Sequence, residues 1–174
     1  PKTFSAIAVT LSELGLAVVD AYVNKAAGKR YFDMFTVLDS DGAEGADAAV
    51  REQIVSRVRA TLANPEPSTR GQSQRVPRQL KELAIPASVS LSPQQEDEPA
   101  TLKISASDRP GLLASLALVL IELGLEISSA RITTLRERVE DIFLVTAKDG
   151  AGLASPEKCY EIENTIRQRL DQAA

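Results

Sequence analysis

The chain has 174 residues, of which 44% are hydrophobic and 25% are charged, a balance typical of one globular domain or two small ones. Its formal net charge of -4 argues against nucleic acid as a partner, because non-specific binding depends on cations that neutralise phosphates. The absence of histidine removes the commonest metal ligand and general base, and a single cysteine cannot form an internal disulfide.

Other functional classes are excluded by patterns along the chain. No apolar run approaches the roughly 20 residues that a membrane-spanning helix needs, so no membrane partner is expected. The unpaired Cys159 favours the reducing cytoplasm, and its place on an apolar helical face predicts a core residue rather than a nucleophile. No carboxylate spacing indicates a metal site or an acid–base pair. We therefore expect no catalytic residue, no metal and no cofactor in this chain.

The first elements in chain order are a helix and two strands. "FSAIAVTLSELGLAVVDAYV" (4–23) has a helical apolar pattern that passes into a strand, and "DMFTVLDSDG" (33–42) predicts the next strand. Ile54, Val58 and Leu62 then mark a second helix. A linker rich in Pro, Ser, Gln and Arg is predicted over 64–84, with a small basic cluster interpreted as solvated. The strand predicted at 85–92 would close this first unit.

The second unit is predicted over 100–174. Residues 101–107 alternate as a half-buried strand, and Asp108 stands where an N-cap carboxylate would precede a helix. Gly124 follows the last apolar position of that helix and predicts its end. Strands are expected over 126–134 and 138–146, and a final helix with one apolar face made by Cys159, Ile162, Ile166 and Leu170.

The two halves repeat each other. Phe4 to Leu16 matches Leu113 to Leu125, and Asp33 to Gly42 matches Asp141 to Gly150 with the register shifted by one residue. The length difference must therefore lie between Val23 and Asp33. Each half is most of a βαββαβ unit, which predicts an α+β fold of two ferredoxin-like units with antiparallel sheets and helices on one face.

The first unit (1–63) lacks its opening strand, and the second lacks its closing strand. A missing central strand would leave backbone groups unpaired, so we expect the chain to be a fragment of a longer protein. The alternative is that another copy or another segment fills the gap.

Particular motifs resemble a known family. "SASDRPGLLASLALVLIELGLEI" (105–127) is similar to the ACT domain, a ferredoxin-like module that binds amino acids and regulates enzymes. "VPRQLKELAIPASVSLSP" (76–93) followed by "DRPGLLA" and "ERVEDIFLVT" further resembles the C-terminal region of the family of bifunctional uridylyltransferase/uridylyl-removing enzymes of PII nitrogen signalling. The resemblance covers nearly the whole chain and is strongest over 76–150.

That resemblance implies a regulatory function without catalysis in this chain. It implies L-glutamine as the ligand, the catalytic domains upstream with a divalent metal of their own, and the PII protein as the parent's partner. A homodimer is left open. The alternative is a stand-alone ACT regulatory protein or the small regulatory subunit of an amino-acid biosynthetic enzyme, which would respond to another amino acid.

The candidate ligand site surrounds the turn before the second unit's helix. Gly111 allows close backbone approach, and the first N–H groups of the helix favour a carboxylate. A ligand ammonium would need an acceptor such as Asp108. The residues predicted to bind ligand are Asp108, Arg109, Gly111, Leu112, Leu113, Glu126 and Ile127.

A second pocket is predicted at the matching place in the first unit, with Ala17, Val18 and Asp20. Two departures weaken the family pattern: where the family often has Asn, this chain has Ala17 and Glu126. The alternative to ligand binding is a purely structural role, with Asp108 only a helix cap and Gly111 only a turn residue. Asp33 and Asp141 are interpreted as turn or strand-edge residues.

Overall fold

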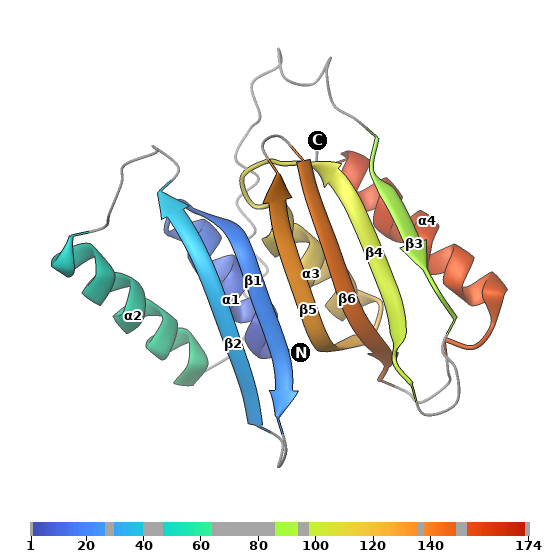
Figure 1. Ribbon diagram of the computed structural model, residues 1–174, viewed down its shortest axis with the longest axis horizontal. Helices are drawn as coiled ribbons and strands as arrows, with labels where there is room; N and C mark the ends of the chain where they lie inside the picture. The colour runs from blue at the N-terminus through green and yellow to red at the C-terminus, as the bar shows by residue number, and fades with distance from the viewer. Residues whose placement is uncertain are drawn as a thin grey trace.

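The computed structural model describes residues 2–26, 30–39, 47–63, 86–93, 98–135, 138–148 and 153–172. Helices and strands follow one another along these residues as labelled in Figure 1. Their bounds are α1 (Lys2–Glu13), β1 (Leu16–Ala26), β2 (Arg30–Asp39), α2 (Ala48–Ala63), β3 (Ser88–Leu91), β4 (Ala100–Ser107), α3 (Leu112–Glu122), β5 (Leu125–Leu135), β6 (Arg138–Ala147) and α4 (Pro156–Gln172).

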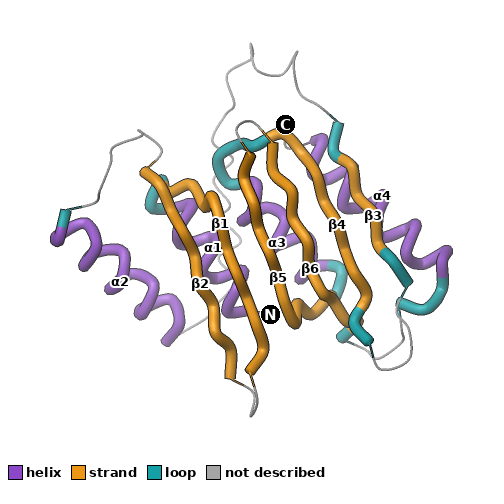
Figure 2. Tube along the Cα trace, viewed as in Figure 1, coloured by secondary structure: helices purple, strands orange, loops and turns teal. Residues whose placement is uncertain are grey.

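The strands form a single antiparallel sheet in the order β2-β1-β5-β6-β4-β3. Helices α1, α3 and α4 lie behind one face of this sheet, and the other face carries no helix among the described residues (Figures 1 and 2). The predicted α+β class and the helices on one face are confirmed. The two units do not form separate sheets, however, because β1 of the first pairs directly with β5 of the second.

The core lies between the sheet and these helices. Alternating residues of β6, among them Phe143 and Val145, are fully buried, whereas Ile142, which precedes Phe143, is 43% exposed. The apolar face predicted for α4 is buried at all of its four positions, including Cys159. Phe4 of α1 packs edge-on against Phe143, with ring centroids 6.3 Å apart, so the core is continuous between the two units. No helix in the described ranges is long and apolar enough to cross a membrane.

Strand register confirms the internal repeat. Asp33 is paired with Val23 in the β1–β2 hairpin, and Asp141 is paired with Ile132 in the β5–β6 hairpin. Both hairpins have a register shift at the same distance from their first residue, between Val18 and Asp20 in one and between Ile127 and Ser129 in the other.

The single-residue length difference lies in the hairpin connections. Ala26 is paired with Arg30 across three intervening residues, and Leu135 is paired with Arg138 across two. The extra residue therefore lies between Val23 and Asp33, as the sequence predicts.

The closing strand of the first unit is a correction. The prediction assigned 85–92 to the first unit, but β3 pairs with β4 of the second, with Ser88 opposite Ser105 and Leu91 opposite Leu102. One edge of β4 is taken by β6, and β3 occupies the other. Val89 and Leu91 are thereby buried against α4, where a closing strand of the second unit was missing from the sequence. The linker predicted over 64–84 lies outside the described residues.

Helix α2 lies beyond the β2 edge of the sheet and packs against α1 (Figure 1). Thr61 of α2 is hydrogen-bonded to the buried Thr10 of α1, with the two Oγ1 atoms 2.9 Å apart. No α2 residue is buried, although Ile54 and Val58 match the buried Ile162 and Ile166 of α4. Helix α4 packs against β3 at the edge of the sheet. Within the described residues, no strand beyond β2 provides a comparable surface for α2.

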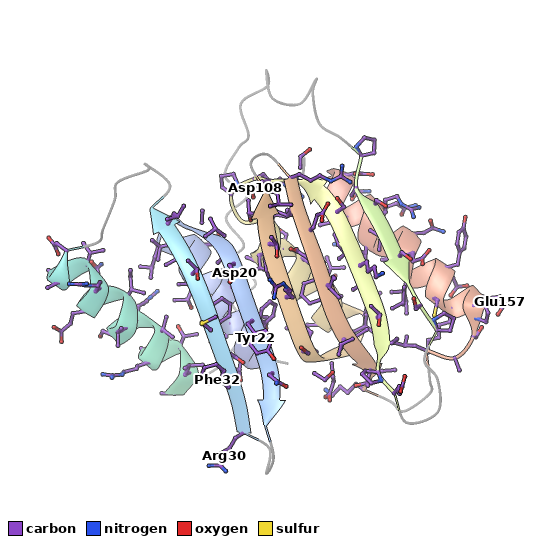
Figure 3. The ribbon with its side chains drawn as sticks, viewed as in Figure 1. Asp20, Tyr22, Arg30, Phe32, Asp108 and Glu157 are labelled. Carbon is purple, nitrogen blue, oxygen red and sulfur yellow. The ribbon has the colours of Figure 1, made fainter. Side chains whose placement is uncertain are left out.

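The helix-free face of the sheet carries exposed apolar side chains over the first unit. Tyr22 and Phe32, labelled in Figure 3, are 39% and 63% exposed, and Met34 and Leu38 are 48% and 55% exposed. Tyr22 is paired with Met34 across the hairpin, and Phe32 lies two residues from Met34 on the same face of β2, so these three side chains are neighbours on the surface.

We expect the matched substitutions Ile162→Ala and Ile54→Ala to differ strongly in their effect on stability. Ile162 is buried, so its truncation should cost roughly 2–5 kcal/mol, whereas the part-exposed Ile54 should cost about 1 kcal/mol or less. The helix propensity change is identical in the two variants. Urea denaturation followed by circular dichroism measures both, and equal losses would show that α2 is packed as tightly as α4.

Candidate functional site

A cavity of about 190 Å³ lies between the two units, at the end of the sheet where β1 begins. Its volume suits a small metabolite rather than a drug-sized ligand. One wall comes from the end of α1 and the start of β1, the opposite wall from the turn before α3 and its first residues, and the base from β5 and β6. The lining residues are Ala8, Ser12, Gly15, Leu16, Ala17, Val18, Asp108, Arg109, Pro110, Gly111, Leu112, Leu113, Ala114, Ile132, Val139 and Asp141.

The pairing of β1 with β5 creates this cavity. Because the two strands are antiparallel, with Ala21 opposite Ile132, the matching helices α1 and α3 also run in opposite directions and contact each other. The end of α1 therefore adjoins the start of α3. A hydrogen bond from the Thr134 hydroxyl to the Val18 carbonyl, 3.4 Å long, ties the strands together beside the cavity.

The structure brings together residues that the sequence assigned to separate pockets. Ala17 and Val18, predicted as a second pocket, line the same cavity as Asp108 and Gly111. Asp20 does not line it, since it lies on the helix-free face with Tyr22; Figure 3 shows Asp20 on β1 and Asp108 at the end of the sheet.

Glu126 and Ile127 also lie outside this cavity. They follow α3, whereas Asp108 precedes it, and a helix of 11 residues separates its two ends by about 16 Å. Turns before and after one helix therefore cannot form one small pocket, and the partner of the Asp108 turn comes from the other repeat instead.

The start of α3 differs from the prediction in its cap. Its N-cap residue is Gly111, in a left-handed conformation with φ of 77°, and no side chain of the described residues caps the helix. Asp108 is not the N-cap; its carboxylate accepts a hydrogen bond from the backbone N–H of Arg109. The first N–H groups of a helix have no intrahelical acceptor, so those of Leu113 and Ala114 lack a side-chain cap where the helix borders the cavity. This end of α3 favours an anion.

Asp141 is a residue whose role the sequence analysis missed. It was interpreted as a turn or strand-edge residue, but it lies within β6, is paired on both sides, and is only 3% exposed. Its Oδ1 atom has no hydrogen-bond partner in the described part of the chain. The sequence alternation could have predicted this burial, because Asp141 lies on the same face of its strand as Val139 and Phe143, which are both buried.

Burial raises the pKa of Asp141 to about 7. A hydrogen bond from the Thr133 backbone lowers it, and the nearby negative charge of Asp108 raises it further. Burial also raises the pKa of Asp108, although that residue is exposed enough to meet solvent. The cavity thus holds two interacting carboxyl groups, one at its mouth and one at its base.

Arg109 connects the turn before α3 to the end of α4. Its Nη2 donates to the Leu170 carbonyl over 2.8 Å, and its buried Nη1 has no hydrogen-bond partner among the described residues. Burial lowers its pKa and the negative charge of Asp171 raises it. The guanidinium keeps its charge, because arginine is not deprotonated in proteins.

The polar groups of the cavity offer a place for negative charge at the start of α3, beside carboxyl groups that accept hydrogen bonds. In the described ranges, no group of three or more His, Cys, Asp or Glu side chains is placed to hold a metal ion. The helix N-terminus can bind an anion, and the two carboxyl groups can accept hydrogen bonds. Most of the other residues that line the cavity are apolar.

Several known proteins that share one name are similar in sequence to this chain. The chain is 36% identical, over 168 residues, to the "bifunctional uridylyltransferase/uridylyl-removing enzyme" of Pseudomonas putida. It is 35% identical over 170 residues to the enzyme of the same name in Ectopseudomonas mendocina, and 34% identical over 170 residues to that of Stutzerimonas stutzeri. The chain is similar to one region of this enzyme.

The similarity extends over nearly all of this chain but only part of each relative. The matches cover 96% or 97% of the chain and 19% of each enzyme's length. No family model matches the chain, and no solved structure does.

The stability difference between the wild type and Asp141→Asn should depend on pH. The unfolded carboxyl loses its proton near the ordinary value of 3.8, whereas the folded one holds it until about pH 7. Wild-type stability relative to the variant should therefore fall as pH rises from about 4 to about 7 and then level off, by up to ~4 kcal/mol. Urea denaturation at several pH values measures this difference, and parallel curves for the two proteins would contradict it.

Proposed function

We propose that this chain is the amino-acid-sensing region, formed by two ACT units, of an enzyme that uridylylates and deuridylylates the PII protein. The observation that carries the proposal is the cavity shared by the two repeats, with a helix N-terminus and two carboxyl groups on its lining. The similarity to uridylyltransferase/uridylyl-removing enzymes supports the choice of parent. Catalysis, with its divalent metal, belongs to domains outside this chain.

L-Glutamine is the proposed ligand, and each of its polar groups has a partner in the cavity. Its α-carboxylate fits the uncapped start of α3, where N–H groups and the helix dipole favour negative charge. Its ammonium fits Asp108 at the mouth of the cavity, where solvent lowers the cost of an ion pair. Its methylenes contact apolar residues such as Leu113 and Val139.

A ligand in this cavity can change the relative arrangement of the two units because it contacts both of them. The walls of the cavity come from α1 and β1 on one side and from the turn before α3 on the other. A ligand that prefers one arrangement of the units shifts their equilibrium, and typical couplings are about 1–3 kcal/mol. The exposed apolar group on β1 and β2 offers a surface through which the upstream domains, or a second copy, would sense that shift.

Calorimetric titration with L-glutamine tests the proposal, with glutamate, serine and branched-chain amino acids as comparisons. We expect saturable binding with a preference for glutamine and a stoichiometry near one, because a single cavity joins the two units in the described residues. Preference for a branched-chain amino acid would favour the small regulatory subunit instead. Binding of none of them would contradict the sensing function.

A matched pair of glycine variants locates the ligand. Gly111 and Gly124 both have positive φ, of 77° and 68°, so alanine is strained by a similar amount at either position. Of the two, only Gly111 would place an added Cβ against the opposite wall, 3.3 Å from the Ser12 hydroxyl. At Gly124 no atom of the described residues lies within 4 Å of that position. We expect Gly111→Ala to weaken glutamine binding at least about tenfold and Gly124→Ala to preserve it. Equal effects would place the ligand elsewhere.

A further inference from the structure

Asp141 presents at the base of the cavity a carboxyl oxygen that has no hydrogen-bond partner among the residues the structure describes. The residue lies on the face of β6 that packs toward the helices, between Ile104 of β4 and Ile132 of β5. Both neighbours are buried apolar residues, and Asp141 itself is only 3% exposed. A buried carboxyl oxygen without a partner costs free energy that a ligand's hydrogen bond would recover.

We propose that Asp141 determines specificity in the cavity by pairing with the side-chain carboxamide of the ligand, and thereby distinguishes glutamine from glutamate. The inference rests on the proposed amino-acid site. Asp108 and the start of α3 hold the α-ammonium and α-carboxylate at the mouth, so the side chain is the part that extends to the base.

The chemistry of the base favours a neutral amide over a charged group. Burial and the charge of Asp108 keep Asp141 partly protonated near neutral pH. A protonated carboxyl donates to the amide oxygen and accepts from the amide NH₂, and an ionised one still accepts from NH₂. A ligand ammonium would require the ionised form in a desolvated place, whereas the carboxylate of glutamate would be repelled by that form.

The same sequence position in the first repeat provides a matched control. Asp33 is paired with Val23 as Asp141 is paired with Ile132, but it lines a separate groove with residues of α1 and α2. Asp33→Asn therefore makes the same chemical change at a matching register without reaching the cavity between the units.

The experiment compares glutamine and glutamate affinities in the intact protein for the wild type, Asp141→Asn and Asp33→Asn. In Asp141→Asn the new amide still pairs with glutamine but also donates to the carboxylate of glutamate. We expect the ratio of the two affinities to fall by about tenfold or more, through tighter glutamate binding, and to stay unchanged in Asp33→Asn.

A pH series separates direct recognition from a structural effect. As pH falls from 8 to 6, wild-type Asp141 gains its proton, so glutamate should bind more tightly and the preference for glutamine should shrink. The Asp141→Asn ratio should not follow this change. The other titratable lining residues are Asp108 and Arg109, which are present in both proteins, and the facing parts of α1, β4 and β5 contribute Ser12, Ile104 and Ile132 without a charge.

The possible results separate this inference from the proposed function. If no amino acid binds the wild type, the sensing function itself fails. If both ligands weaken equally in Asp141→Asn, then Asp141 meets the α-ammonium and the assignment of specificity is overturned. A lower ratio in both Asn variants would also overturn it, because the effect would then be indirect.

Discussion

The antiparallel pairing of β1 with β5 is the interaction on which the other features of this molecule depend. It joins five residue pairs, from Asp20 opposite Thr133 to Asn24 opposite Ser129, and it links two half-sheets that would each otherwise expose an edge. Because it reverses the direction of one repeat relative to the other, it also places α1 beside α3 with opposite polarity. The C-terminal end of one helix then meets the N-terminal end of the other, and a cavity between repeats follows from that geometry.

Equivalent sequence in the two repeats acquires different physical properties because the repeats have different neighbours. The second unit has β4 and β3 beside β6, so its α4 is buried on one face and its Asp141 is removed from solvent. In the first unit no described strand pairs with the outer edge of β2. Its α2 has no buried residue, and Asp33 remains only half-buried although its pairing register matches that of Asp141. Tertiary neighbours, and not local sequence, decide which carboxyl group has its pKa raised to about 7.

The cavity combines polar groups that are costly to bury with a lining that is mostly apolar. Three polar groups that lack a partner within the described part of the chain lie at or near one small volume: the start of helix α3, the Nη1 of Arg109 and the Oδ1 of Asp141. Such groups are rare in a protein interior that has only to be stable, and they are explained if a ligand completes them. The proposed ligand would satisfy groups from both repeats, so its binding would be coupled to the relative arrangement of the repeats.

The sequence by itself determined the local structure and the repeat, because these depend on short-range periodicity. The helical spacing of Cys159, Ile162, Ile166 and Leu170, the alternation around Phe143 and the extra residue between Val23 and Asp33 were all readable, as was the turn at Gly111. Only the tertiary structure decided three features: β3 pairs with the second unit, the end of α1 faces the Asp108 turn, and Asp141 lines a cavity. Those depend on which strand edges pair, and backbone hydrogen bonds between edges are almost independent of side-chain identity, so they leave little trace in the sequence.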